Sequence, residues 1–82
     1  MNEIIEFEIL GNYRICLKFQ DGHEKVVYIR PLIEKDFARE LLEEANFAKV
    51  EIESGGGLAW FNGYDMCPNF LRELPAEKKD VA

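Results

Sequence analysis

Histidine and cysteine are scarce in this sequence, which limits the catalytic and metal chemistry that it can carry. The 82 residues include one histidine, His23, and two cysteines, Cys16 and Cys67. One histidine cannot supply a multi-histidine metal site, and beside Asp21-Gly22 we expect it to be an exposed turn residue. The cysteines match neither a CxxC motif nor a zinc-ligand spacing, so we expect free thiols rather than a disulfide.

Long apolar runs and clustered basic residues are also missing. No run approaches the roughly 18 apolar residues that a membrane-spanning helix requires, and the acidic amino terminus is unlike the start of a signal peptide. We therefore expect a cytoplasmic protein. The 10 Lys and Arg residues are outnumbered by 16 Asp and Glu residues, which gives a formal net charge of −6. Because phosphate binding needs clustered cationic side chains, we expect this domain alone to bind no nucleic acid.

The rest of the composition is that of a small globular domain. Hydrophobic residues make up 48% of the chain and charged residues 32%, a balance that argues against disorder. The length allows one hydrophobic core. We expect a single domain over residues 1–75 and a flexible tail over residues 76–82, because the tail has little apolar surface to bury.

Alternating apolar and polar side chains predict three strands, which cover residues 4–10, 13–19 and 24–30. In the first strand Ile5, Phe7 and Ile9 lie on one side, and we expect this side to face the core. The Asp21-Gly22 pair predicts a tight primed turn, in which both residues have positive φ. Short connections between the strands predict an antiparallel meander.

A helical period follows over residues 34–45. Its apolar stripe consists of Phe37, Ala38, Leu41, Leu42 and Ala45. We expect Asn46 to end the helix in a left-handed conformation. The acidic residues Glu40, Glu43 and Glu44 form mainly a solvated face, which is also the surface that we expect a basic partner to use.

The last third of the chain predicts a second hairpin and a short final helix. Its strands are expected over residues 47–53 and 58–61, and its final helix over residues 68–74. Asn62-Gly63 predicts a tight turn, and Pro68 suits a first helical turn. The expected fold class is α+β, with the order β-β-β-α-β-β-α: a three-stranded antiparallel meander, one helix, a second β-hairpin and a short C-terminal helix. We expect the strands to form one curved sheet or a partly closed barrel.

The segment around the single tryptophan holds the aromatic candidates for partner binding. If Trp60 points outward beside Phe61 and Tyr64, the resulting patch next to a glycine loop suits a protein contact. In a domain of this size, a single tryptophan is more often a core residue. The sequence favours the core position for Trp60 and leaves the outward position open.

Asp65 and Cys67 are candidates for chemistry. Asp65 could bind a cation, and Cys67 could be a reactive thiol at a helix amino terminus. We favour structural roles, in which Asp65 accepts backbone hydrogen bonds at the helix entry and Cys67 caps or packs. The glycines at 55–57 are no phosphate loop, because no Lys-Ser/Thr pair follows them. We therefore expect no catalytic residue, no metal and no cofactor.

Motifs along nearly the whole chain match one family pattern. They are Tyr13-Arg14-Ile15, Leu17, Phe19, Asp21-Gly22, Val27-Tyr28-Ile29, Leu32, Phe47-Ala48-Lys49-Val50, Gly57, Trp60, Asn62-Gly63, Asp65, Cys67-Pro68 and Leu71. Together they resemble DUF2442, a family of small bacterial and phage proteins of uncharacterised function. The run Trp-x-Asn-Gly-x-Asp-x-x-Pro over residues 60–68 is the most specific part, and Phe61 stands where the family typically has proline.

The resemblance implies a compact α+β domain, found in some relatives ahead of a helix-turn-helix domain and in others alone beside a toxin-like partner. It supplies no catalytic residues, and we assign structural roles to Asp21, Gly22, Gly57, Asn62, Gly63, Asp65 and Pro68. Our main hypothesis is a non-enzymatic protein-interaction module that forms a homodimer or binds a protein partner. One alternative is an antitoxin-like regulator whose acidic helix binds a basic toxin-like partner, and another is a small enzyme that uses Asp65 or Cys67.

Overall fold

The computed structural model describes residues 2–34 and 36–76. The first sheet has the order β1-β2-β3 and consists of β1 (Ile4–Gly11), β2 (Arg14–Phe19) and β3 (Glu24–Tyr28). The second sheet has the order β4-β5-β6 and consists of β4 (Glu51–Ile52), β5 (Leu58–Ala59) and β6 (Asp65–Met66). Between the sheets run the 3₁₀ helices η1 (Arg30–Leu32) and η2 (Asp36–Leu42) and the helix α1 (Glu44–Phe47), and α2 (Pro68–Glu73) follows β6.

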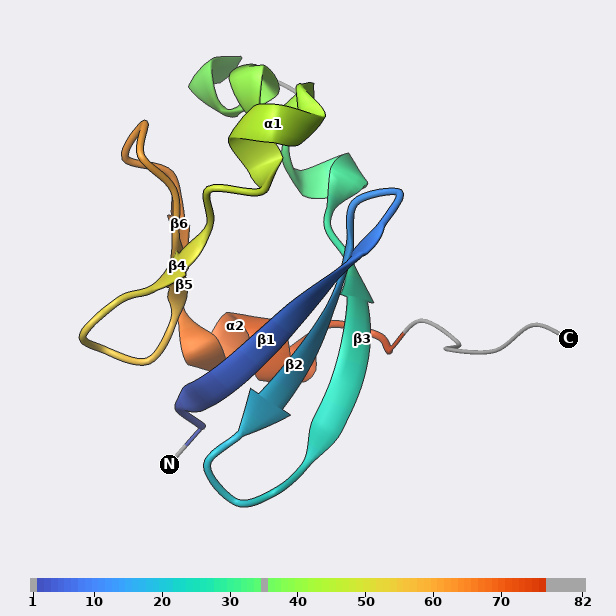
Figure 1. Cartoon of the computed structure of the whole chain (residues 1–82). Coiled ribbons are helices and arrows are strands. Elements are labelled where there is room, and N and C mark those ends of the chain that lie inside the picture. Colours follow the sequence, from blue (N-terminus) through green and yellow to red (C-terminus); the bar gives the residue numbers. More distant parts are fainter. Residues whose placement is uncertain (1, 35, 77–82) are drawn as a thin grey trace, which may run out of the picture.

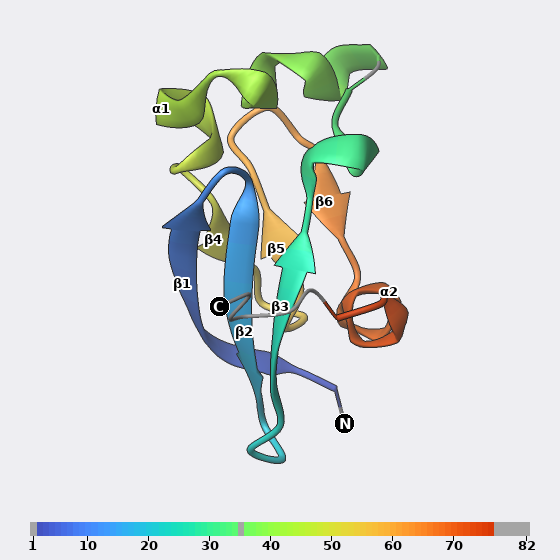
Figure 2. The same ribbon diagram turned by 90° about the vertical axis from the view of Figure 1, so that its right-hand side faces the viewer.

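The two antiparallel sheets face each other, and helical segments close the two ends of the space between them (Figures 1 and 2). η2 and α1 cover one end, and α2 lies at the opposite end beside β3 (Figure 2). We call η1, η2 and α1 together the helical connection. Both sheets, the helical connection and α2 contribute to one hydrophobic core. The α+β class is confirmed, and the element order agrees roughly with the prediction. The predicted arrangement of all strands in one curved sheet or a partly closed barrel is wrong, because the strands form two separate sheets.

The central strand β2 follows the predicted alternation. Ile15, Leu17 and Phe19 are fully buried, whereas the residues between them are partly exposed. Both neighbours of β2 pair with it antiparallel, as the short connections predict.

β1 departs from the prediction at its start. Ile4 is only 2% exposed and belongs to the core, whereas Ile5 is 49% exposed. The pairing register shifts between Ile4 and Glu6. Such a bulge adds one residue to a strand, so the side chains before it point to the other face. Phe7 and Ile9, after the bulge, pack against the core as predicted.

Three hairpin loops share one hydrogen-bonding pattern; they cover residues 20–22, 54–56 and 61–63. In each loop the third residue is a glycine with φ between 90° and 92°. This is the three-residue loop with a bulge at a left-handed glycine. The primed turn predicted at Asp21-Gly22 is wrong, because only the glycine has a positive φ. In two of the loops an Asp or Asn side chain also accepts a hydrogen bond from the backbone N–H two residues later, at 3.1 Å.

The single helix predicted over residues 34–45 is wrong, because the segment divides into η2 and α1. Ala38 and Leu41 are buried as predicted, but Ala45 is exposed. Asn46 lies inside α1 and is not a left-handed stop. The side chain of Phe37 lies outside the described part of the chain, as do the tail residues 77–82.

Competing hydrogen bonds explain why this segment is not a regular α-helix. In an α-helix the carbonyl of Glu40 would accept the N–H of Glu44. Here it accepts the N–H of Glu43 at 3.3 Å, as in a 3₁₀ helix, and Nδ2 of Asn46 at 3.0 Å. The carbonyl of Leu42 accepts the hydroxyl of Tyr13, which lies far away in the sequence. Local helical periodicity cannot predict such partners, because they come from the tertiary fold.

The second sheet is shorter than predicted and contains one more strand. The strand expected over residues 47–53 is reduced to β4, because Phe47 still belongs to α1. β6 has no counterpart among the predicted strands, because its two residues are too few to show an alternating pattern. β5 and β6 approach closely at Gly57, where a Cβ would overlap the carbonyl oxygen of Met66. α2 begins at Pro68, as predicted.

Candidate interaction surfaces

Four aromatic rings form a chain from the first hairpin to the β5–β6 loop. The centroid of Tyr13 lies 5.4 Å from that of Phe47, in an edge-to-face contact. Phe47 lies 5.8 Å from Trp60, and Trp60 lies 5.9 Å from Tyr64. These separations are within the range of favourable aromatic pairs. This row of aromatic rings therefore links the two sheets next to the helical connection.

The polar atoms of these aromatic side chains bind backbone carbonyls of the helical connection. Trp60 Nε1 donates to the carbonyl of Phe47 at 2.9 Å, and the Tyr64 hydroxyl donates to that of Leu32 at 3.0 Å. Trp60 is only 4% exposed, so its core position is confirmed and its outward position is wrong. Tyr64 is half-buried, and burial, followed by the charge of Asp65, raises the pKa of its hydroxyl. Neither residue presents its whole ring to a partner.

Phe61 is the aromatic residue of this segment that faces solvent. Its side chain is 56% exposed at the tip of the β5–β6 loop. The next residue, Asn62, donates from Nδ2 to Oε2 of Glu40 at 3.2 Å and accepts the N–H of Tyr64. Nζ of Lys49 lies 5.1 Å from the centroid of the Phe61 ring, within reach of a cation–π interaction. The loop is therefore held against η2 with its phenyl ring outward.

The three acidic candidates are exposed on η2 and α1. Glu40 lies on η2, Glu43 precedes α1 as its N-cap residue, and Glu44 lies in the first turn of α1. The Asn62 contact brings this acidic segment and Phe61 together, although the two are far apart in the sequence. We call Glu40, Glu43, Glu44 and Phe61 the acidic–aromatic surface.

Asp21 and Gly22 occupy a structural position. Oδ2 of Asp21 lies 3.0 Å from Nη2 of Arg72, and the Arg72 guanidinium stacks 4.8 Å from the centroid of the Phe19 ring. The hydrogen bond from Arg72 and that from the backbone N–H of His23 lower the pKa of the Asp21 carboxyl. Through these contacts Arg72 ties α2 to the β2–β3 loop.

The candidates for chemistry lie on separate elements. His23 follows the β2–β3 loop, Asp65 belongs to β6 rather than to the helix entry, and Cys67 precedes α2; all three are exposed. Cys67 is the N-cap residue, but its side chain makes no capping hydrogen bond. Cys67 and Cys16 are free thiols, as predicted. Within residues 2–34 and 36–76, no group of three His, Cys, Asp or Glu side chains is placed to hold a metal ion.

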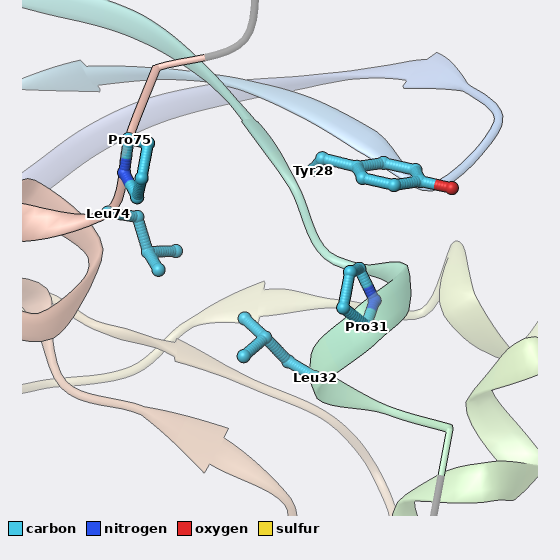
Figure 3. A pocket seen from close by; sticks show the side chains of 5 residues that line it. All are labelled: Tyr28, Pro31, Leu32, Leu74 and Pro75. Carbon is cyan, nitrogen blue, oxygen red and sulfur yellow. The ribbon is translucent and has the colours of Figure 1, made fainter.

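A second surface, which the sequence analysis missed, lies between the end of β3 and the end of α2 (Figure 3). Its hollow has a volume of about 240 Å³ and is lined by Tyr28, Pro31, Leu32, Leu74 and Pro75. We call it the β3–α2 groove. The sequence contains one signal for this groove, the pairs Pro31-Leu32 and Leu74-Pro75. In each pair a leucine stands beside a proline at the end of a helical or strand element.

Lys25 fixes one wall of the β3–α2 groove. Its Nζ donates to the carbonyl of Arg72 at 2.7 Å and also binds that of Leu74. Arg72 lies in the last turn of α2 and Leu74 is the C-cap residue of this helix, and carbonyls at a helix C-terminus lack intrahelical partners. Burial, followed by the charge of Arg72, lowers the pKa of the Lys25 ammonium group. The end of α2 is thereby held beside β3.

Comparison with known proteins identifies a family. A family model described as "Protein of unknown function (DUF2442)" matches residues 4–74. No curated protein and no solved structure matches the chain. No helix in the described part of the chain is long and apolar enough to cross a membrane.

Proposed function

Since the chain belongs to the DUF2442 family, whose function is unknown, we propose that it is a non-catalytic module that acts through protein contacts in the bacterial cytoplasm. We propose the acidic–aromatic surface as its partner-binding site. The hydrogen bond of 3.2 Å between Asn62 and Glu40 carries this proposal, because it holds the loop that bears the exposed Phe61 against the acidic segment at Glu40.

The chemistry of this surface favours a basic partner segment. Glu40, Glu43 and Glu44 attract cationic side chains and steer their approach. Phe61 adds an exposed aromatic anchor, although Nζ of Lys49 already lies 5.1 Å from the centroid of its ring. The side-chain amide of Asn62 donates a hydrogen bond from Nδ2 and accepts one at Oδ1, and these two bonds hold the loop in place. Because the loop is already ordered, it loses less conformational entropy when a partner binds.

An antitoxin-like regulator is the second candidate. The exposed carboxylates on η2 and α1 support it, since they are suited to neutralising a basic toxin-like partner. This candidate predicts one near-stoichiometric partner whose binding weakens steeply with salt, whereas a general interaction module need not show a single strongly basic partner.

Recovery of partners from a native lysate tests the proposed surface. The bait proteins are the wild type, Phe61→Ser and the double variant Glu43→Lys/Glu44→Lys, with Glu6→Lys/Glu8→Lys as a control of equal charge change on β1. We expect a partner to bind the wild type and the β1 control and to lose at least about tenfold in affinity for the other two, as for the loss of an interface hot spot. Circular dichroism verifies that each bait is folded.

The opposite pattern would reject the proposal. A partner that binds Phe61→Ser and Glu43→Lys/Glu44→Lys as tightly as the wild type does not use the acidic–aromatic surface. Asp65→Ala and Cys67→Ala address the enzymatic alternative, which predicts that one of these changes abolishes an activity while the fold stays intact. Both side chains are exposed, and the proposed interaction module predicts that neither change alters partner binding.

A further inference from the structure

We infer that the β3–α2 groove is a self-association site, through which two copies of this chain form a two-fold symmetric dimer, each inserting Phe70 into the groove of the other. This inference rests on the proposal that the domain acts through protein contacts, but it uses a different surface. The groove and the inserting residue are both present on one chain, so no other molecule is required.

The size and walls of the groove suit a phenyl ring. Its volume is about 240 Å³, and Tyr28, Leu32 and Pro75 are among the side chains that surround it (Figure 3). A protein cavity of about 150 Å³ with apolar walls is large enough to bind benzene. The groove is open to solvent rather than enclosed, and its volume leaves room for a phenyl ring.

Phe70 is placed to enter such a groove on a second copy. Its side chain is 44% exposed on α2, although it is a large apolar residue. Leu74 lies four residues later and lines the groove, and residues four apart on a helix lie on the same side. The ring and the groove are thus neighbours. A two-fold axis between them lets both insertions form at once and closes the assembly as a dimer.

Charge complementarity supports a second copy as the occupant. The guanidinium of Arg14 lies 4.6 Å from the centroid of the Tyr28 ring, so one cationic group adjoins a wall of the groove. Glu73 is exposed on α2, three residues after Phe70. When Phe70 enters the groove of the second copy, the acidic side chain of Glu73 is brought toward that cationic group.

The contact area predicts a weak, reversible dimer. One aromatic side chain buries about 150–250 Å² in full, and since Phe70 is 44% exposed, each ring has only about 70–110 Å² left to bury. Two rings and the walls that receive them therefore bury roughly 250–450 Å² in total. Stable interfaces bury about 1,200–2,000 Å². Because the expected area is much smaller, we expect dissociation in the high micromolar range or above.

Sedimentation equilibrium of the purified chain from about 10 μM to 1 mM tests this inference, because that range brackets a weak dimer. We expect the wild type to approach the dimer mass as concentration rises and Phe70→Ser to remain a monomer. Phe61→Ser is the matched control, since it also removes an exposed phenyl ring, and it should associate like the wild type. Circular dichroism of each variant verifies the fold.

A charge exchange provides the second test. Arg14→Glu and Glu73→Arg should each weaken association about tenfold, a typical loss at a charged interface pair, and the double variant should recover most of it. A wild type that stays monomeric to about 1 mM, or a Phe70→Ser variant that associates normally, overturns the inference without affecting the acidic–aromatic surface. Loss of association in Phe61→Ser also overturns it, because self-association would then use that other surface.

Discussion

Replacing Trp60 by phenylalanine tests whether the aromatic chain holds the fold together. The change removes the N–H that donates to the buried Phe47 carbonyl at 2.9 Å. Leaving a buried acceptor without its donor costs about 1–3 kcal/mol. The smaller ring also leaves a void, and since Trp→Ala costs about 3–5 kcal/mol, the partial loss to phenylalanine adds about 1–2 kcal/mol. We expect a total loss of about 2–5 kcal/mol in the free energy of unfolding.

This loss is large for such a small domain. At about 0.05–0.15 kcal/mol per residue, the whole chain is stabilised by roughly 4–12 kcal/mol. A loss of 1 kcal/mol lowers the melting temperature of a domain of this size by about 4–8 °C, so Trp60→Phe should lower it by at least about 8 °C. Thermal and urea unfolding followed by far-ultraviolet circular dichroism measures both quantities without using tryptophan fluorescence.

Phe61→Leu is the control for this measurement. Its side chain adjoins Trp60 in the sequence but is 56% exposed, so its replacement should change stability by less than about 0.5 kcal/mol. A Trp60→Phe variant that loses no more than the control would refute the role given to the hydrogen bond and the buried ring.

Two further substitutions test the loops. Gly57→Ala should destabilise the fold by about 1–3 kcal/mol, because its methyl group would overlap the carbonyl of Met66. Gly55→Ala, where nothing lies within 4 Å of the added atom, should be nearly neutral, and equal urea midpoints for the two variants would contradict this reasoning. The contact with Arg72 lowers the pKa of Asp21, so its stabilisation is present above the ordinary carboxyl pKa and is lost as pH falls through the lowered value. Asp21→Asn should therefore flatten the decline of stability below about pH 4, and an unchanged pH profile would show that the pair with Arg72 does not contribute.

Periodicity predicted those elements in which one face is buried along its whole length and the other face is partly exposed along its whole length. β2 lies between two strands and alternates without interruption, so its pattern could be read directly. The same reasoning failed for Ile5, because the β-bulge before Glu6 depends on pairing with another strand. A bulge leaves no composition signal of its own here. The strand could be predicted, but the face to which its first side chains point could not.

The helical connection shows a second limit of local reasoning. Its residues have the apolar spacing of an α-helix, yet the carbonyl of Leu42 binds the Tyr13 hydroxyl and that of Phe47 binds Trp60. A donor from another element can replace an i→i+4 bond and allow a tighter or interrupted helix. The sequence contains these donors, but it does not show which carbonyls they reach.

The candidate site was partly predictable for the same reason. Exposure of Glu40, Glu43 and Glu44 followed from the polar face of a helical pattern. The proximity of Phe61 to Glu40 did not follow, because it depends on the Asn62 contact between two distant segments. The β3–α2 groove depends in turn on Lys25, which holds the end of α2 beside β3.

The break in the helical connection also affects where the carboxylates of Glu40 and Glu44 lie. A continuous α-helix over residues 34–45 would align Glu40 with Glu44 on one face, four residues apart. In the structure η2 ends at Leu42 and α1 begins at Glu44, so these two carboxylates belong to different helices. The side chain of Glu40 instead meets the β5–β6 loop, which places a phenyl ring beside the acidic segment. The hydrogen bond from the Tyr13 hydroxyl to the Leu42 carbonyl lies at the break between these two helices, although Tyr13 does not belong to the acidic–aromatic surface.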